Sequence, residues 1–168
     1  MKIAEMLVQD GERHDDALHM ESAPVNMRLF KDMRGYRYLI YDIVKHLKFV
    51  AEHEFEDYPE VQGISGANVG VPFNIVIVIT KDGAEIFLNP TIIGASEEMV
   101  SCNSNCGSLN LPKKVKIMRH RWVIVEYYDM VGEKHVHTFR IGDGDLVSSA
   151  TLQHEIEHNL GILVTDKG

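Results

Sequence analysis

The chain has 168 residues, a formal net charge of -8 and a hydrophobic content of 45%. These values are typical of one soluble globular domain with a sizeable core. No apolar run approaches the roughly 20 residues of a membrane span. The N-terminal stretch turns acidic too early for a secretory signal, so we expect a cytoplasmic protein. The only basic run, PKKVKIMRHR (residues 112–121), alternates apolar and basic residues. It predicts a strand with one solvated face rather than a nucleic-acid surface.

The first half of the chain predicts one long helix followed by strands. The first thirty residues are polar and predict irregular structure. Apolar residues then recur at helical spacing between Tyr36 and Asp57, which predicts an amphipathic helix. Residues 58–73 are rich in glycine and bounded by prolines, which predicts a loop or a bulged strand. The run NIVIVIT (residues 74–80) is β-branched and continuous, as in a buried strand. The helix is predicted from Ile40, Ile43, Val44, Leu47, Val50 and Ala51.

The second half predicts further strands and a closing helix. Residues 85–90 predict a second strand after the turn KDG, whereas residues 96–112 are polar and predict irregular structure. Residues 121–129 and 135–141 predict a hairpin. The last helix is expected to begin near Ser148 or Ser149, because serine caps helices well. The order of helix, several strands and helix favours an α+β fold with mostly antiparallel strands.

The last predicted helix carries the pattern H-E-x-x-H, with His154, Glu155 and His158. On a helix, residues four apart lie on one face, so the two histidines can share one cation. Glu155 lies about 100° round the helix from His154 and can reach the open side of that cation without binding it. This pattern is typical of a metal site with an acid/base glutamate. The alternative is a helix that carries two histidines by chance.

A working site of this kind needs a third protein ligand. We expect no later helix with a ligating glutamate, and Val164 stands where the extended pattern H-E-x-x-H-x-x-G-x-x-H requires a histidine. The third ligand is therefore expected upstream. The candidates are His120, His135, His137, an acid or a cysteine. An exposed strand face accounts for His135 and His137, so a cysteine thiolate in a polar, glycine-containing segment is the stronger candidate.

The two cysteines are Cys102 and Cys106. Without an export signal we expect no structural disulfide between them. Their spacing would allow a metal-binding pair, but two ordinary thiols explain it equally well. Nothing at this point favours either cysteine as the third ligand.

Between about Val61 and Leu163 the chain resembles the peptide deformylases in three short motifs. HEIEHNLGIL (residues 154–163) stands where the family has H-E-x-D-H-L-x-G-x-L, with Glu157 for the aspartate and Asn159 for the first leucine. GISGANVG (residues 63–70) stands where the family has G-L-A-A-P-Q-V-G, with Asn68 for the glutamine. The resemblance implies a single deformylase-like domain over residues 1–168, with mostly antiparallel sheets packed around the C-terminal H-E-x-x-H helix.

The family's E-G-C-L-S motif, which supplies the third ligand, fits this chain in two registers. NCGS (residues 105–108) makes Cys106 the ligand, whereas a shift by two places Ser108 there. We favour Cys106, because a thiolate binds such a cation better than a neutral hydroxyl does. In this register Ser104 replaces the motif's glutamate. Arg119 matches the arginine that pairs with that glutamate in the family, so we expect it to have lost its usual partner.

The resemblance implies hydrolysis of N-formylmethionyl peptides, with release of formate. Cys106, His154 and His158 would hold one divalent ion, Fe²⁺ first, with Zn²⁺, Ni²⁺ or Co²⁺ also possible. The ion lowers the pKa of its water, and Glu155 moves the proton to the leaving amine. The oxyanion would be stabilised by the ion, the Gly107 N–H and the Asn68 amide.

The glycine-rich first motif implies a place for the substrate. Gly63, Ile64, Ser65 and Gly66 would lie beside the substrate backbone, which can pair there as an added strand. The same glycines are also explained by a tight turn. The expected partners are nascent formylated peptides, near the ribosome in the family, bound by a monomer that contacts neither nucleic acid nor membrane.

Two other functions remain open. The missing glutamate and the change from glutamine to Asn68 favour a family member that binds metal but has weak or no activity. The retained H-E-x-x-H and nearby cysteine favour an active enzyme. A small zinc peptidase that acts on unformylated peptides is a third class, and the absence of its usual third-ligand patterns weighs against it.

Overall fold

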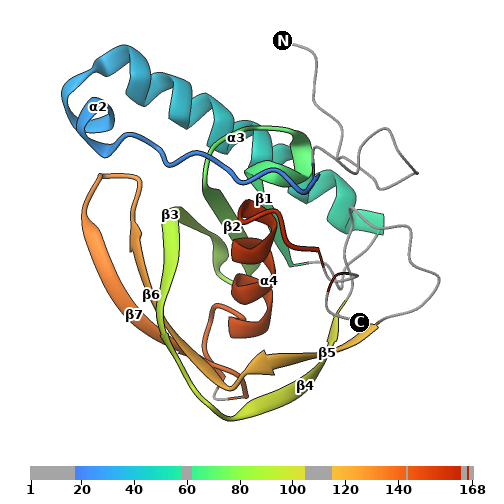
Figure 1. Cartoon of the computed structure of the whole chain (residues 1–168). Helices are drawn as coiled ribbons and strands as arrows, with labels where there is room; N and C mark the ends of the chain where they lie inside the picture. The colour runs from blue at the N-terminus through green and yellow to red at the C-terminus, as the bar shows by residue number, and fades with distance from the viewer. Residues whose placement is uncertain (1–17, 58–61, 105–114, 143, 164–165, 167–168) are drawn as a thin grey trace.

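A computed structural model of the chain describes residues 18–57, 62–104, 115–142, 144–163 and 166. Figure 1 shows how their helices and strands are arranged. The elements are α2 (Met27–Asp32), α3 (Arg34–Asp57), β1 (Gly63–Ser65), the 3-10 helix η1 (Gly66–Val69), β2 (Ile75–Thr80), β3 (Gly83–Ala95), β4 (Met99–Ser104), β5 (Val115–His120), β6 (Trp122–Tyr128), β7 (Lys134–Arg140) and α4 (Ser149–Asn159).

The strands form two antiparallel sheets. The larger has the order β1-β2-β3-β6-β7, and the smaller pairs β4 with β5. Strand β3 is the central strand of the larger sheet. Its first half pairs with β2, and its second half pairs with β6. Its pairing with β6 shifts register between Leu88 and Thr91 and again between Ile92 and Gly94. Such irregularities bend a strand. The antiparallel α+β class expected from the sequence is confirmed.

The larger sheet is buried on both faces at β2, which explains the continuous apolar run there. Ile75 and Ile77 pack into the cluster that contains the buried face of α3. Val76 and Val78 point to the opposite face and pack with Leu152 of α4. Alternate residues of a strand point to opposite faces. Helix α3 therefore covers one face of the sheet, and α4 lies against the other (Figure 1).

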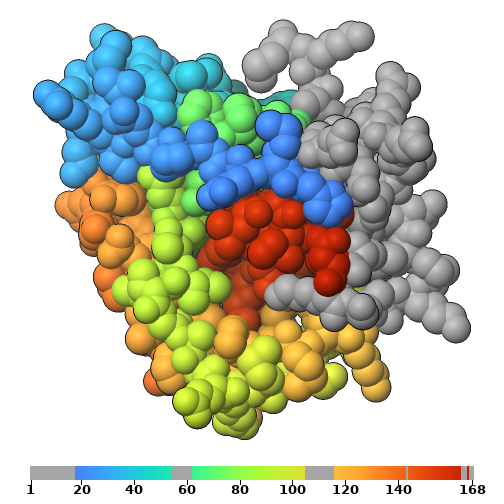
Figure 2. Space-filling view, viewed as in Figure 1, coloured from blue at the N-terminus to red at the C-terminus, as the bar shows by residue number. Residues whose placement is uncertain are grey.

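Helix α4 begins as expected, with Ser148 as its N-cap accepting a hydrogen bond from the Thr151 N–H. Its C-terminal end contacts the N-terminal segment of the described chain. The Ser22 N–H donates to the Asn159 carbonyl oxygen at 2.8 Å, and Figure 2 shows this segment (blue) running along the border of the C-terminal residues (red). Helix α4 is thus held between the sheet and the N-terminal segment.

Three expectations from the sequence need correction. Residues 96–112 were expected to be irregular, but they include strand β4, which pairs along its whole length with β5. The polar residues of this hairpin hide its strand character, because no strong apolar alternation marks it. Helix α2 lies within the N-terminal stretch expected to be irregular, capped by Asn26. The strand expected at residues 85–90 extends over Gly83–Ala95.

No helix in the described part of the chain is long and apolar enough to cross a membrane.

Candidate active site

The two histidines of the H-E-x-x-H pattern face each other on α4. Their Nε2 atoms are 3.1 Å apart, and the rings are close to perpendicular. Two nitrogens bound about 2.0–2.1 Å from a tetrahedral ion would lie about 3.3–3.4 Å apart, so the spacing fits a shared cation. His158 is 1% exposed. Its burial, together with the charge of Arg119, lowers its pKa to about 4. It is therefore neutral near pH 7, as a metal ligand must be.

Glu155 lies beside this pair and is 3% exposed. Its pKa is raised to about 8, chiefly by burial; the charge of Arg119 opposes this shift, and the nearby charge of Glu157 adds a smaller upward contribution. Its Oε2 atom is buried and has no hydrogen-bond partner among the described residues. Buried carboxyl groups are normally satisfied. An exception of this kind, next to two converging imidazoles, is typical of a functional site that takes an ion or water.

Gly63 on β1 is required by the position of Glu155. A Cβ atom on Gly63 would lie 2.6 Å from Thr151 Cγ2 and 2.7 Å from Glu155 Cγ. Only glycine therefore lets β1 approach α4 this closely. The space next to Gly63 is occupied by side chains of α4, which gives this glycine a structural reason independent of any substrate.

Arg119 on β5 connects the smaller sheet to α4. It is 2% exposed, and its Nη1 lies 2.5 Å from Glu157 Oε2. Its Nη2 lies 3.3 Å from His154 Nδ1. We expected this arginine to have lost its usual partner, and Glu157 supplies one from the helix. No local sequence pattern marks this pair, because Arg119 lies on a strand and Glu157 on a helix far along the chain.

A pocket opens between β1, the β4–β5 sheet and α4. Arg119, His154 and Glu155 line it together with Cys102. Burial raises the pKa of the Cys102 thiol, with a smaller opposing effect from Arg119. Its other lining residues are Gln62, Gly63, Asn103, Ser104, Ile117, Ala150 and Thr151.

Cys106 and Gly107 lie outside the described residues. Ser108, the alternative ligand in the second register, also lies there. The structure therefore leaves the choice of third ligand as it stood from the sequence. Ser104, the last residue of β4, is buried and lines the pocket.

Asn68 is buried in η1, and its side chain is oriented by Ser65. Its Oδ1 accepts hydrogen bonds from the Ser65 N–H and the Ser65 hydroxyl, both at 2.7 Å. This is a capping arrangement. Asn68 is not among the described residues that line the pocket with Glu155. Its role as an oxyanion donor stays a prediction.

The other residues predicted to bind substrate are also buried. Ile64 and Ser65 belong to β1, and both are 0% exposed. A Cβ atom on Gly66 would lie 2.5 Å from the Phe73 carbonyl oxygen, so this glycine serves a close approach of two backbone segments. Strand β1 comes first in the order of its sheet. Pairing of a substrate strand along β1 remains a prediction.

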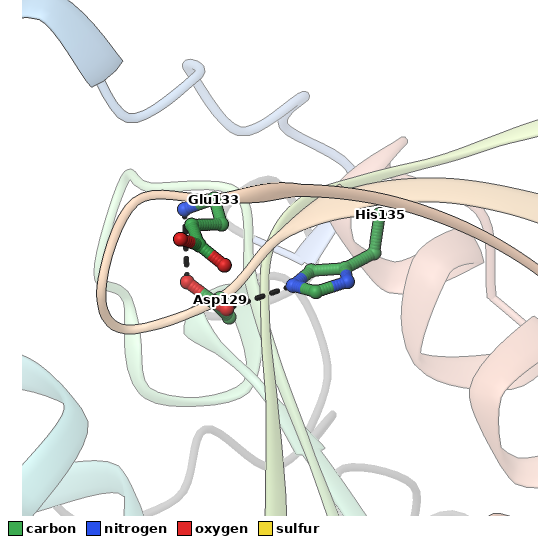
Figure 3. Close-up of side chains that lie close together, drawn as sticks. All are labelled: Asp129, Glu133 and His135. Carbon is green, nitrogen blue, oxygen red and sulfur yellow. Dashed lines mark hydrogen bonds and ion pairs between the residues drawn. The ribbon is translucent and has the colours of Figure 1, made fainter.

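A second group of possible ligands lies in the β6–β7 hairpin. Asp129, Glu133 and His135 place three ligand atoms within 4.8 Å of one another (Figure 3). Asp129 Oδ1 accepts from the Val131 and Glu133 N–H groups, and Asp129 Oδ2 lies 2.7 Å from His135 Nε2. These contacts explain the group as a stabilised turn. It shares no residue with the pocket at α4.

The sequence is similar to a known protein family and to individual members of it. Residues 7–168 match the family described as Polypeptide deformylase. A peptide deformylase-like protein of Bradyrhizobium diazoefficiens is 33% identical over 98 residues, which is 56% of this chain and 54% of that protein. This match thus spans about half the length of that relative. The peptide deformylase of Rhodopseudomonas palustris is 27% identical over 146 residues, or 81% of this chain and 79% of that protein.

Solved structures agree in fold. The class I type b peptide deformylase of Acinetobacter baumannii, with Met-Ala-Ser bound, has a TM-score of 0.77 at 22% identity and covers 100% of both chains. The peptide deformylase of Thermotoga maritima has a TM-score of 0.78 at 18% identity, covering 99% of this chain and 98% of that one. The chain therefore belongs to the polypeptide deformylase family.

Proposed function

We propose that this protein is a metal-dependent hydrolase that removes the formyl group from N-formylmethionyl peptides and releases formate. The observation that supports this most directly is the 3.1 Å approach of the two Nε2 atoms of His154 and His158 beside the buried Glu155. Family membership supports the hydrolase class. His154, His158 and Cys106 would hold one divalent ion, with Fe²⁺ the first choice and Zn²⁺, Ni²⁺ and Co²⁺ the alternatives. When bound, this ion would lower the pKa of a water molecule and polarise the formyl oxygen.

In this proposal the chain's own residues move one proton and place the peptide. Glu155 takes a proton from the attacking water at its carboxylate, the formyl C–N bond breaks, and the same proton passes to the leaving amine. The Gly107 N–H and the Asn68 amide would donate to the oxygen of the formyl group as charge develops there. Gly63, Ile64, Ser65 and Gly66 would lie beside the substrate backbone.

The test is formate release from an N-formylmethionyl peptide by protein purified anaerobically with Fe²⁺. We expect turnover by the parent and a loss of about 10²-fold or more in Glu155→Ala, because general acid–base catalysis contributes about that much. The matching N-acetyl peptide is the control for selectivity. No turnover by a fully metallated parent would contradict the proposal.

A metal-binding family member without deformylase activity is the second candidate. The observation that favours it is the orientation of Asn68, whose amide oxygen accepts two hydrogen bonds from Ser65. An amide held in this way is less free to turn toward a substrate oxygen. A parent that carries one equivalent of metal but releases no formate would support this candidate.

The proposed third ligand has its own test with a matched control. Cys106→Ser should lose most of the bound metal, because a hydroxyl is a poor substitute for a thiolate. Cys102→Ser changes the other cysteine, which lines the pocket, and should keep its metal. Equal metal content in Cys106→Ser and the parent would eliminate Cys106 as a ligand.

We also propose that the protein acts as a monomer in the cytoplasm on nascent formylated chains near the ribosome, without binding nucleic acid or membrane itself. The net charge of -8 supports the absence of a nucleic-acid surface. Light scattering should give a mass near 19.0 kDa. A mass of twice that value would contradict the monomer.

A further inference from the structure

Arg119 is a large, buried and positively charged side chain beside the two histidines. It is 2% exposed and reaches two groups of α4, Glu157 at 2.5 Å and His154 Nδ1 at 3.3 Å. A buried guanidinium is tolerated only where a partner compensates its charge. Here Glu157 compensates it, at a position adjoining the proposed cation.

Two carboxylates of α4 lie near this single guanidinium. Glu155 and Arg119 line the same pocket, and their charges interact. Among the described residues, the ion pair of Arg119 is with Glu157. Arg119 is therefore paired with one of the two acidic residues of α4 that lie near it.

A second set of contacts holds the two elements that carry this ion pair. Gln153 Oε1 accepts from the His120 N–H at 3.1 Å, and Gln153 Nε2 donates to the His120 carbonyl oxygen at 2.9 Å. Gln153 precedes His154 on α4, and His120 follows Arg119 on β5. The backbone of β5 is thus fixed to α4 one residue away from Arg119.

We propose that Glu157 is a positioning residue that anchors Arg119 beside His154 and keeps its guanidinium off Glu155. The proposal rests on the metal-dependent function proposed above and deepens it. With Glu157 in place, the positive charge of Arg119 is balanced and does not repel a divalent ion held by His154. Without Glu157, the guanidinium would be free to bind the Glu155 carboxylate, which the reaction needs.

The test is titration of the metal-free protein with Co²⁺, followed by its visible absorption. Loss of an outer-shell partner typically costs 10–100-fold in metal affinity. We therefore expect Glu157→Gln to weaken Co²⁺ binding by about 10–100-fold and to change the d–d absorption bands. Glu98→Gln is the control, because it breaks an exposed ion pair with Arg121. It should change neither quantity.

A rescue variant separates positioning from simple loss of stability. Ser104 lines the same pocket as Arg119 from the neighbouring strand, so a glutamate there can approach the guanidinium. Adding Ser104→Glu to Glu157→Gln should recover at least tenfold of the lost Co²⁺ affinity. If Glu157→Gln does not fold, Glu157→Asp takes its place, with an expected three- to tenfold loss and the same recovery on adding Ser104→Glu.

Several results would overturn this inference. They are unchanged Co²⁺ affinity and spectrum in the folded Glu157 variant, an equal loss in Glu98→Gln, or no recovery in the double variant. Because the readout is metal binding, it separates this inference from the proposed reaction. A parent that binds Co²⁺ but releases no formate leaves the role of Glu157 intact, whereas a parent that binds no Co²⁺ contradicts both.

Discussion

At the scale of single residues, the site depends on how closely β1 approaches α4. Gly63 has no side chain, and the space that a Cβ would need is filled by Thr151 and Glu155. A methyl group there would therefore move the proposed acid/base carboxyl. Close packing of β1 on α4 and the placement of the Glu155 carboxyl therefore both require glycine at position 63.

The first prediction concerns this contact. Gly63→Ala should lower the free energy of unfolding by about 1–3 kcal/mol, the usual cost of overpacking, and should reduce formate release by displacing Glu155. Urea denaturation and the peptide assay measure the two effects. Gly35→Ala is the control, because a Cβ at Gly35, near the start of α3, meets nothing within 4 Å. Equal stability of the two variants would contradict the account.

The buried Glu155 predicts how the metal-free protein responds to pH. Its pKa is about 8 in the folded state against 4.5 for the free side chain, chiefly through burial. The folded state then holds the proton more tightly than the unfolded state does. Unfolding releases a proton between these two values, so the free energy of unfolding falls as the pH rises from about 4.5 to 8, by at most roughly 1.4 kcal/mol per pH unit.

Glu155→Gln isolates this effect, since glutamine has the same shape and does not ionise. In the metal-free state, the parent and Glu155→Gln should unfold at similar temperatures below about pH 4.5. The variant should become increasingly more stable than the parent up to about pH 8. Thermal unfolding across this pH range measures the difference. A difference that does not change with pH would show that Glu155 is not the buried acid described above.

At the scale of elements, α4 is fixed at its C-terminal end by Asn159. Its Nδ2 donates to Asn74 Oδ1 and the Ile75 carbonyl oxygen, and its Oδ1 accepts from the Ser22 hydroxyl. Deformylases have a leucine at this position. Here the buried residue is polar, and the neighbouring Leu160 is 51% exposed.

Asn159→Leu should therefore destabilise the protein although it restores the family's residue. We expect a loss of about 1–3 kcal/mol, because buried polar partners are left unsatisfied. Leu160→Asn, at the exposed neighbour, should change stability by less than about 0.5 kcal/mol. Chemical denaturation compares the two. A larger loss for Leu160→Asn than for Asn159→Leu would contradict this description of the helix end.

At the scale of the whole molecule, the sequence predicts the main helices and core strands better than it predicts the residues around the pocket. The apolar spacing of α3 and the β-branched run of β2 predict their elements because burial dictates both patterns. The buried face of α3 includes Ile40, Val44 and Leu47 as expected. Strand β4 escaped prediction, because its polar residues are paired with β5 rather than covered by a core on both faces.

In the site, too, the features that one element fixes were predictable, whereas those that depend on contacts between elements were not. His154, Glu155 and His158 were predictable because one helix fixes their spacing. The ion pair of Arg119 with Glu157 joins residues 38 positions apart on a strand and a helix, so no local pattern reveals it. The structural demand on Gly63 likewise comes from α4. Cys106 and Gly107 remain predictions from the resemblance.

The central claim is that His154 and His158 hold the ion that makes this protein a deformylase. The most direct test is formate release from an N-formylmethionyl peptide while Fe²⁺ is added stepwise to metal-free protein under anaerobic conditions. Activity should rise in proportion to metal up to one equivalent and then stop rising, and His158→Ala should give no such rise. An absence of formate at full metal loading, or equal activity in His158→Ala, would contradict the claim.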